Sequence, residues 1–480
     1  MAEPTVAARE EDAAVQVVSL YQKQKKIYAR AVSGWFAGWR WALVWATQLL
    51  FYGLPWLEWN ARQAVLFDLG ARRFYIFGLV LYPQDFIYLT GLLIISAYAL
   101  FLFTAVAGRL WCGFACPQTV YTEIFMWIER RIEGDRPQRM KRDAGGWTLD
   151  RTWRAAAKQL AWIAVALWTG FTFVGYFTPI KTLWVSVTTL GLGPWEWFWI
   201  LFYGFATYGN AGYMREQVCK YMCPYARFQS AMFDKDTMII SYDAERGEPR
   251  GTRGRKTDLK AANLGHCIDC GLCVQVCPTG IDIRNGLQYE CIGCAACIDV
   301  CNGVMDKMNY PRGLVRYVTQ NGMAHHWTRG QMLRHVLRPR VLVYTAILGL
   351  IVVAVLGSLW LRSPFKVDVV RDRASLARLV EDGWIENVYR LQVMNATERP
   401  QRYRITAAGF DRVEVEPADD LAVAPAEARW VPVSVRVPPE VAQQVGAGAH
   451  PLTFRIERLP EPDGGAAVAL DEKTTFMIPR

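Results

Sequence analysis

The chain carries two closely related stretches: Cys267-Ile-Asp-Cys270-Gly-Leu-Cys273-Val-Gln-Val-Cys277-Pro278 and, 24 residues later, Cys291-Ile-Gly-Cys294-Ala-Ala-Cys297-Ile-Asp-Val-Cys301. Each is a C-x2-C-x2-C-x3-C run, in which three cysteines at two-residue gaps surround one face of an iron–sulfur cubane. Small residues between them, such as Gly271 and Ala295, let backbone N–H groups approach the sulfides. The doubled pattern predicts an inserted two-cluster ferredoxin domain of the bacterial type, with an α+β fold.

The fourth cysteine of each run is expected to ligate the other cluster, as in two-cluster ferredoxins. We therefore predict two [4Fe–4S] clusters with crossed ligation. The first is held by Cys267, Cys270, Cys273 and Cys301, and the second by Cys291, Cys294, Cys297 and Cys277. Eight cysteines also fit two all-thiolate zinc sites by count, but zinc sites separate their cysteine pairs by a long spacer, which is missing here. Asn302 follows Cys301 where many ferredoxins have proline, a change that affects the surroundings of the cluster and leaves its ligation intact.

Four further cysteines form two matched motifs, Cys112-Gly-Phe-Ala-Cys116-Pro117 and Cys219-Lys-Tyr-Met-Cys223-Pro224, separated by 107 residues. The repeat indicates an internal duplication of a helical hairpin. The i, i+4 spacing predicts two thiols on one helical face. Because proline favours the first position of a helix, Cys116 and Cys223 are expected to be the N-caps of helices over 118–131 and 225–233.

The helix N-termini and the nearby Arg109, Arg215 and Lys220 predict depressed thiol pKa values at these C-x3-C-P motifs. Such thiolates suit a soft ion, namely Cu(I), Zn(II) or iron–sulfur. The alternative is that they are small buried apolar residues, as free cysteine often is. All 12 cysteines lie between Cys112 and Cys301, and this clustering favours metal ligation in a reducing compartment over a disulfide scaffold.

The composition indicates an integral membrane protein. Of 480 residues, 52% are hydrophobic and 20 are tryptophan, which excludes a disordered chain and suits a protein with membrane–water boundaries. Five segments approach the roughly 20 residues needed to cross a bilayer: Trp41–Leu57, Phe86–Ala107, Gln159–Ile180, Trp195–Tyr213 and Val341–Leu361. The apolar segment Phe74–Tyr82 is too short to span and is interpreted as interfacial or re-entrant.

The distribution of Lys and Arg predicts the topology. The connection 108–158 holds ten basic residues and the connection 214–340 holds eighteen, whereas the two other connections hold few. The N-terminus and both cysteine-bearing connections are therefore expected to be cytoplasmic, and the tail after Arg362 periplasmic, in a multi-pass protein of the bacterial inner membrane. The net charge of +10 is then explained by topology and by anionic lipid, and nucleic-acid binding is not expected because no recognition motif accompanies the charge.

The tail predicts a small Ig-like β-sandwich. Alternating stretches over 388–393, 402–405 and 430–437 are separated by Pro, Gly, Asn and Asp turns. The predicted organisation is a cytoplasmic arm over 1–34, a four-span membrane domain over 35–240, a ferredoxin domain over 241–320, a linker with the fifth span over 321–362, and the sandwich over 363–480.

The order of these parts, the two C-x3-C-P motifs, the double cluster run and the stretch 299–317 together resemble the cytochrome c oxidase accessory proteins of the CcoG/FixG/RdxA type, which are membrane-bound polyferredoxins. The resemblance covers nearly the whole chain. It implies a role in biogenesis of cbb3-type cytochrome c oxidase, with reduction of Cu(II) to Cu(I) for copper delivery. It makes Cys112, Cys116, Cys219 and Cys223 candidate copper or catalytic residues, so the implied cofactors are two [4Fe–4S] clusters and copper.

The implied partners are membrane lipid, a cytoplasmic electron donor, and copper chaperones or oxidase assembly factors that dock on the sandwich. Two other functions stay open. One is a quinol-linked electron-transfer subunit of a respiratory chain, which shares the C-x3-C-P motifs, although the chain has no C-x-x-C-H haem motif. The other is a non-catalytic, redox-sensing scaffold for oxidase assembly.

Overall fold

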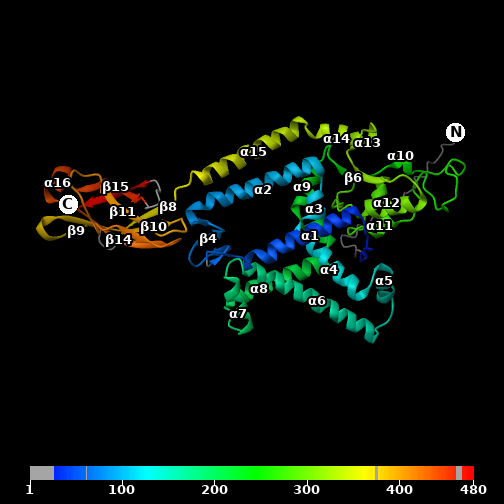
Figure 1. Cartoon of the computed structure of the whole chain (residues 1–480), viewed down its shortest axis with the longest axis horizontal. Helices are drawn as coiled ribbons and strands as arrows, with labels where there is room; N and C mark the ends of the chain where they lie inside the picture. Colours follow the sequence, from blue (N-terminus) through cyan, green and yellow to red (C-terminus); the bar gives the residue numbers. More distant parts are fainter. Residues whose placement is uncertain (1–25, 61, 373–376, 461–466, 480) are drawn as a thin grey trace, which may run out of the picture.

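A computed structural model describes residues 26–60, 62–372, 377–460 and 467–479. Three parts follow one another along the long axis of the molecule: a β-sandwich at one end, long helices in the middle and the cysteine-rich domain at the other end (Figure 1). Most of the predicted N-terminal arm, residues 1–25, lies outside the described residues. The described part of the arm contacts the cysteine-rich end, where the Arg30 amide donates to the Gln275 carbonyl oxygen over 2.8 Å.

The helices of the middle part include α1 (Trp35–Gly53), α2 (Phe86–Ala107), α6 (Leu149–Val174), α8 (Pro194–Thr207) and α15 (Pro339–Trp360). Among the described residues, three are long and apolar enough to cross a membrane: α2 extended to Pro83, α6 and α15. The prediction of five spans is thus supported for three. Helix α1 carries the charged Arg40 and many tryptophans, and α8 has only 14 residues before a π-helical turn, η3 (Tyr208–Met214), distorts it.

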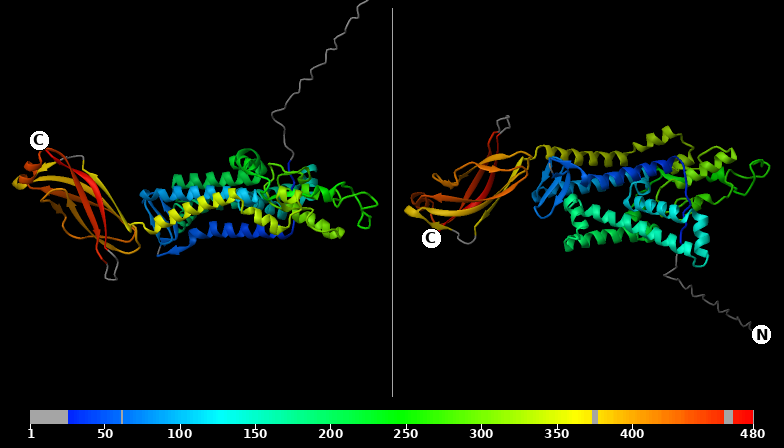
Figure 2. Two further views of the ribbon diagram at one scale, coloured as in Figure 1. Left: turned by 90° about the horizontal axis from the view of Figure 1, so that it is seen from above. Right: turned by 60° about the horizontal axis from the view of Figure 1, so that its bottom comes forward.

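The helices pack closely in pairs where they present small residues. A Cβ atom on Gly170 of α6 would lie 2.2 Å from the Ile200 carbonyl oxygen of α8, and one on Gly91 of α2 would lie 2.9 Å from Val355 of α15. Such contacts are typical of helices that meet within a membrane. Figure 2 shows the same helices running side by side from two further directions.

The helix observed in place of the predicted third segment, Gln159–Ile180, begins and ends earlier than predicted. Helix α6 begins at Leu149, where the Thr148 side chain accepts a hydrogen bond from the Arg151 amide, and it ends at Val174 before Gly175. The chain then turns at Pro179, the N-cap of the short α7 (Ile180–Thr188). Capping residues therefore decided the bounds, since the apolar pattern alone placed the helix too late.

The segment Phe74–Tyr82, interpreted as interfacial or re-entrant, forms strands of a small sheet. It supplies β4 (Arg73–Ile76) and β5 (Leu79–Leu81). Strand β4 pairs antiparallel with both β5 and β3 (Val65–Asp68) and so lies in the middle of a three-stranded sheet. The adjoining chain forms η1 (Leu54–Trp56), the short pair β1 (Glu58–Trp59) and β2 (Arg62–Gln63), and η2 (Pro83–Asp85). One side of the sheet is buried against the C-terminal domain through Tyr82, whose hydroxyl donates to the Asn395 carbonyl oxygen over 2.9 Å.

The cysteine-rich end is built from short elements. Those of the first C-x3-C-P region are α3 (Leu110–Phe114), α4 (Pro117–Glu133) and α5 (Arg136–Ala144); those of the second are η4 (Val218–Met222) and α9 (Pro224–Met232). The remaining domain holds β6 (Ile239–Tyr242), α10 (Ala244–Gly247), α11 (Leu272–Gln275), η5 (Ile283–Asn285), α12 (Ala296–Met308), β7 (Val315–Val318), α13 (Gln320–Ala324) and α14 (Arg329–Val336). Strands β6 and β7 pair antiparallel and flank the cysteine runs.

The C-terminal domain consists of two antiparallel sheets. One has the order β12-β14-β10-β8 with β9 at β10, and the other the order β13-β11-β15-β16. Their bounds are β8 (Phe365–Arg371), β9 (Arg378–Leu379), β10 (Ile385–Asn395), β11 (Gln401–Ala408), β12 (Glu414–Glu416), β13 (Leu421–Val423), β14 (Ala428–Val437), β15 (Gly448–Arg458) and β16 (Val468–Ile478), with η6 (Glu381–Gly383) and α16 (Pro439–Val445). The three alternating stretches lie in β10, β11 and β14, and their inward residues fill one core between the sheets. The predicted β-sandwich is confirmed.

A buried ion cluster joins the sandwich to the helices. Asp85, whose side chain is 2% exposed, contacts Arg362 just after α15 and Lys366 of β8, each over 2.5 Å. Removing one partner would leave an uncompensated buried charge, so this cluster fixes the domain against the helix ends.

Candidate functional site

The first group of cysteines surrounds an apolar cavity in the cysteine-rich domain. Its walls include Cys267, Cys270, Cys273 and Cys301, together with Leu272, Leu314 and other apolar side chains. Cys301 comes from α12 and so reaches the cavity from the second run, while the other three come from the first run. Burial raises the pKa of the Cys301 thiol to about 12, and charge on Cys273, Cys267 or Cys270 raises it further.

A second cavity has the complementary lining. Its cysteines are Cys277, Cys291, Cys294 and Cys297, among isoleucines and alanines, and Cys273 lines both cavities. Burial raises the pKa of Cys291 to about 12, and the neighbouring charges that raise it further are those of Cys294 and Cys277. The structure therefore brings the eight cysteines into the two sets that crossed ligation requires.

The donor sets fit iron–sulfur cubanes. Each cavity offers four thiols. Burial raises the pKa values of five of them, so a proton occupies these sulfurs unless a metal replaces it; the five are Cys273, Cys291, Cys294, Cys297 and Cys301. The loops turn sharply where they would wrap a cubane, with left-handed backbone at Gly271 (φ 63°), Gly293 (φ 70°) and Ala295 (φ 60°). When bound, the clusters would supply one-electron chemistry.

The second cavity is attached to the first long helix. Asp299 of α12 accepts hydrogen bonds from the amides of Phe36 and Ala37 over 3.2 and 2.7 Å, and so satisfies the first turn of α1. One turn further on, the buried Arg40 donates from Nη1 to the Cys294 carbonyl oxygen over 3.3 Å. These contacts hold the cluster-binding loop at the end of a long helix.

The C-x3-C-P cysteines lie where their helices break. Cys116 is the N-cap of α4 and Cys223 the N-cap of α9, as predicted. Cys112 belongs to the preceding helix α3, and Cys219 to the π-helical turn η4. The two thiols of each pair therefore straddle a break, and the prediction of one continuous helical face is wrong because the proline after each motif starts a new helix.

The pKa values of Cys112, Cys116 and Cys219 are raised, which corrects the prediction of depressed values for these three thiols. Burial raises the pKa of Cys112 to about 12 and that of Cys219 to about 11, and it also raises the pKa of Cys116. Arg109 lowers the pKa of Cys112 and Cys219 but does not offset burial. Charge on Cys116 raises the pKa of both Cys112 and Cys219, and charge on Cys223 raises that of Cys116, so the four thiols influence one another across the two motifs.

The two cysteine sets meet at a backbone contact. A Cβ atom on Gly113, next to Cys112, would lie 2.7 Å from the Cys294 amide nitrogen and Cα. In return, a Cβ atom on Gly293 would lie 3.0 Å from the Arg109 carbonyl oxygen. The side chains of Cys112 and Cys219 pack against the apolar cluster that contains Cys294. Only hydrogen at both glycine positions permits this approach.

Arg109 links the two loops as well. Its guanidinium donates to the carbonyl oxygens of Tyr289 and Cys291 in the cluster domain and to that of Ala226 in α9. On the other side, the Cys112 thiol donates to Gln229 Oε1 over 3.4 Å. Sequence reasoning treated Arg109 only as a charge near the thiols and missed Arg40, Asp299 and Gln229, because their partners lie far away along the chain.

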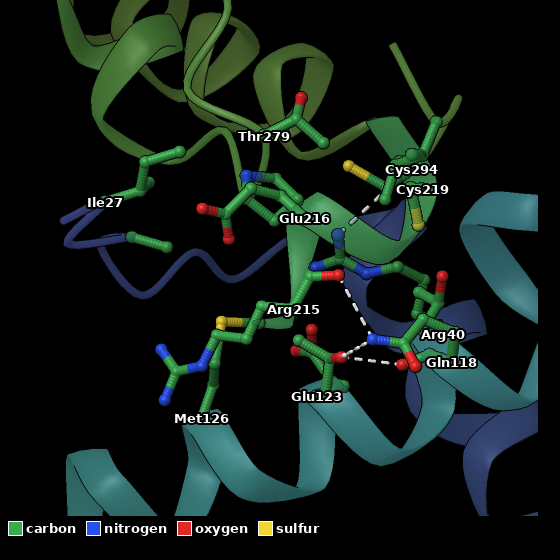
Figure 3. A pocket seen from close by; sticks show the side chains of 15 residues that line it. Ile27, Arg40, Gln118, Glu123, Met126, Arg215, Glu216, Cys219, Thr279 and Cys294 are labelled. Carbon is green, nitrogen blue, oxygen red and sulfur yellow. Dashed lines mark hydrogen bonds between the residues drawn. The ribbon is translucent and has the colours of Figure 1, made fainter. Parts of the chain in front are cut away.

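A pocket gives access to this junction (Figure 3). Its volume is about 40 Å³, and its walls include Cys219 and Cys294 together with Glu123, Met126 and Glu216. Figure 3 shows Cys219 and Cys294 next to each other on one wall, whereas the Glu216 carboxylate points toward Ile27. A small solute in the pocket would therefore reach a C-x3-C-P thiol beside a cluster cysteine.

Among the described residues, no group of three or more His, Cys, Asp or Glu side chains is arranged closely enough to hold a single metal ion. A cubane spreads its four cysteines wider than one ion does, so this result is compatible with the two ferredoxin cavities.

The fold and the site define a membrane protein with an inserted iron–sulfur electron-transfer domain. The family model described as a 4Fe-4S dicluster domain matches residues 214–320, one described as a 4Fe-4S binding domain matches residues 89–134, and one described as the IG-like fold at the C-terminus of FixG, putative oxidoreductase, matches residues 355–479.

Curated relatives extend the match to most of the chain. The chain is 36% identical to protein RdxA of Cereibacter sphaeroides, covering 94% of this chain and 97% of the relative, and 39% identical to protein RdxB of the same organism, covering 82% and 83%. It is 37% identical to the nitrogen fixation protein FixG of Rhizobium meliloti, covering 82% and 80%. The chain belongs to the FixG/RdxA family, as its motifs predicted.

Proposed function

We propose that this protein reduces Cu(II) to Cu(I) at the cytoplasmic membrane edge during biogenesis of cbb3-type cytochrome c oxidase. Cys267, Cys270, Cys273 and Cys301 hold one [4Fe–4S] cluster, and Cys277, Cys291, Cys294 and Cys297 hold the other. Cys112, Cys116, Cys219 and Cys223 receive copper. The resemblance to the accessory proteins supports the copper and oxidase roles, and the family membership supports the iron–sulfur chemistry.

One observation carries the proposal, namely the contact of Gly113 with Cys294 at the junction of the two cysteine sets. It brings the backbone of a C-x3-C-P motif against the backbone of a cluster ligand with no side chain between them. An electron held at the second cavity is therefore one residue away from the Cys112 thiol. A protein whose clusters were purely structural would not need this approach.

The chemistry balances as a one-electron step. A [4Fe–4S] cluster held by Cys277, Cys291, Cys294 and Cys297 would supply, when bound and reduced, the one electron that converts one Cu(II) to Cu(I), with no proton consumed by the copper couple. Thiolates stabilise the Cu(I) product. Because the thiol pKa values at Cys112, Cys116 and Cys219 are raised, copper binding there displaces protons, and the pocket of Figure 3 supplies the path to water.

We further propose the topology that the basic connections indicate. Helices α1 and α8 would join α2, α6 and α15 as spans, with the cysteine-rich end in the cytoplasm and the sandwich in the periplasm of the bacterial inner membrane. The N-terminal arm 1–34 and the basic residues of α4 and α5 then face anionic lipid headgroups. The sandwich would dock copper chaperones or oxidase assembly factors.

The decisive experiment uses the full chain, purified anaerobically in detergent with its clusters reduced by dithionite and the excess removed. Cu(II) is added, cluster reoxidation is followed by absorbance, and Cu(I) is trapped with a chelator. We expect one Cu(I) per electron lost, and loss of this reaction when Cys112, Cys116, Cys219 and Cys223 are all changed to Ser. Equal rates in that variant, with clusters intact, would remove the C-x3-C-P cysteines from the route, and no Cu(I) from either protein would refute copper reduction.

A second candidate occupant of the C-x3-C-P cysteines is iron–sulfur. The match of the 4Fe-4S binding domain to residues 89–134 includes Cys112 and Cys116 and favours it. Iron and acid-labile sulfide per chain separate the two candidates: two cubanes contain eight irons, and a third cluster would add to that number. The fourfold Ser variant would lose the additional iron only if these cysteines hold it.

A further inference from the structure

Two buried arginines from the helical part of the chain contact the second cluster cavity. Arg40 is the only charged residue of α1, and Arg109 precedes α3; each is 6% exposed. Arg40 Nη1 donates to the Cys294 carbonyl oxygen over 3.3 Å, and Arg109 Nη1 donates to the Cys291 carbonyl oxygen over 3.4 Å. Each guanidinium therefore contacts the backbone of one ligand of the second cluster.

The charge of Arg40 is not neutralised by a salt bridge within the part of the chain that the structure describes. The carboxylates whose charges act on it are those of Glu123 and Asp299, and the Asp299 carboxylate accepts hydrogen bonds from the amides at the start of α1. A buried charge without a counter-charge is costly. A cluster with its four thiolates is negative, so the second cavity is where the counter-charge of Arg40 belongs.

The two guanidinium charges act on the ligand sulfurs as well as on the backbone. Burial raises the pKa of the Cys294 thiol, whereas Arg40 lowers it, and this effect of Arg40 is larger than the opposite effect of Glu123. Burial likewise raises the pKa of Cys291 to about 12, and Arg109 lowers it. Both arginines thus stabilise negative charge at the sulfurs of the second cavity.

The first cavity has a different charge environment. Arg284 lines it and is paired with Asp269 over 2.5 Å and with Asp282 over 2.7 Å, so two carboxylates offset its charge. Arg253 donates to the Cys267 carbonyl oxygen over 3.4 Å, but its side chain is partly exposed and is therefore screened by water. The buried, unneutralised positive charge lies at the second cavity.

We propose that Arg40, assisted by Arg109, raises the reduction potential of the cluster in the second cavity. Reduction adds one electron, and hence one negative charge, to this cluster and its thiolates, and a buried positive charge stabilises that state. One electron then passes from the first cluster, which is oxidised, to the second, which is reduced, without transfer of a proton. The helical part of the chain supplies the charge that directs the electron toward Cys112. The inference rests on the iron–sulfur part of the proposed function and does not depend on copper as the acceptor.

The test is a redox titration of the full chain in detergent, followed by electron paramagnetic resonance, with the second-cluster signal assigned in Cys301→Ser. Arg40→Gln keeps a hydrogen-bond donor but removes the charge. It should shift the equilibrium between the two clusters about tenfold away from the reduced second cluster, which lowers the potential of that cluster by about 59 mV. Arg40→Lys keeps the charge and should restore most of this shift. Glu123→Gln removes a negative charge that acts on Cys294, so it should raise the same potential.

The matched control is Arg312→Gln, because the Arg312 side chain belongs to the same domain, is 70% exposed and pairs with Asp306; neither potential should change. An unchanged second potential in Arg40→Gln, equal shifts in Arg40→Gln and Arg40→Lys, or a lowered potential in Glu123→Gln would each overturn the proposal. If iron analysis shows that Arg40→Gln has lost a cluster, Arg40→Lys and Glu123→Gln decide the question. Cu(I) formation by the reduced wild-type protein is measured separately, so failure of the charge effect is distinguished from failure of the proposed function.

Discussion

The ferredoxin cavities and the C-x3-C-P junction use the same residue type in different ways. Each cavity is lined by three cysteines of one run and the last cysteine of the other run. The ligands of a cluster are therefore recognisable from spacings within short stretches of sequence. At the junction, the thiols of each pair flank a helix break, and what surrounds them is supplied by Arg109, Gln229 and the cluster loop. A local motif can thus define a cofactor site, whereas a transfer site depends on what is packed against it.

The largest effect is expected from breaking the crossed ligation. Cys301→Ser should remove the cluster that Cys267, Cys270 and Cys273 hold and leave the signal of the cluster at Cys291, because Cys301 lines the first cavity although it belongs to the second run. Electron paramagnetic resonance of the reduced protein, with iron analysis, measures this. The control is Cys112→Ser, which should keep both signals. Selective loss of the second cluster would show that the ligation is not crossed.

The second-largest effect is expected from removing the charge of Glu129, which is ion-paired near the C-x3-C-P junction. Glu129 of α4 is 1% exposed and contacts Arg139 over 2.8 Å and Arg215 over 3.0 Å. Burial favours its neutral form, yet Arg215, Arg139 and Lys158 hold the pKa of this carboxyl below its usual range. Glu129→Gln leaves two arginines without their counter-charge and should lower the free energy of unfolding by about 3–5 kcal/mol.

Thermal unfolding of Glu129→Gln in detergent tests this estimate. The matched control is Glu245→Gln, because the Glu245 side chain is largely exposed and its contact with His326 spans 3.6 Å. A Glu129 variant as stable as this control would mean that the ion pairs of Glu129 with Arg139 and Arg215 do not stabilise this part of the structure.

The raised thiol pKa values predict slow alkylation at the junction. In metal-free protein, Cys219 with a pKa of about 11 is mostly protonated at neutral pH. Its thiolate fraction should rise about tenfold per pH unit until the pH reaches that pKa. Iodoacetamide labelling at pH 7, followed by mass spectrometry, should therefore be about 100-fold slower than for a thiol with a pKa near 9. Glutathione in the same tube is the reference, and equal rates would show that burial does not protect this site.

The smallest effect is expected at the junction contact itself. Gly113→Ala places a methyl group against the Cys294 backbone and should cost about 1–3 kcal/mol of stability through overpacking. It should keep both clusters but slow electron passage to the C-x3-C-P site. Gly303→Ala in α12 is the matched control, because a Cβ atom there meets nothing within 4 Å. If both variants transfer electrons at the wild-type rate, the contact is not the route.

The sequence determined those parts that depend on local spacing. The cluster runs define their own loops, the prolines after Cys116 and Cys223 place helix starts, and period-2 alternation in 388–393 and 430–437 defines two sandwich strands. Each of these features is fixed by residues within a few positions of one another. Helix bounds were predicted less well, because the N-cap of α6, Thr148, is a single residue outside the apolar pattern.

Tertiary structure alone decided the raised thiol pKa values, the Gly113–Cys294 contact and the contact of Arg40 with Cys294. These features join residues distant in sequence; Arg40 and Cys294, for instance, are 254 residues apart. Burial of a thiol depends on all the elements around it, and its desolvation outweighed the basic neighbours and helix N-terminus that the sequence made visible. Packing between elements sets how close two sites approach, because the position of one helix against another is fixed by the side chains of both.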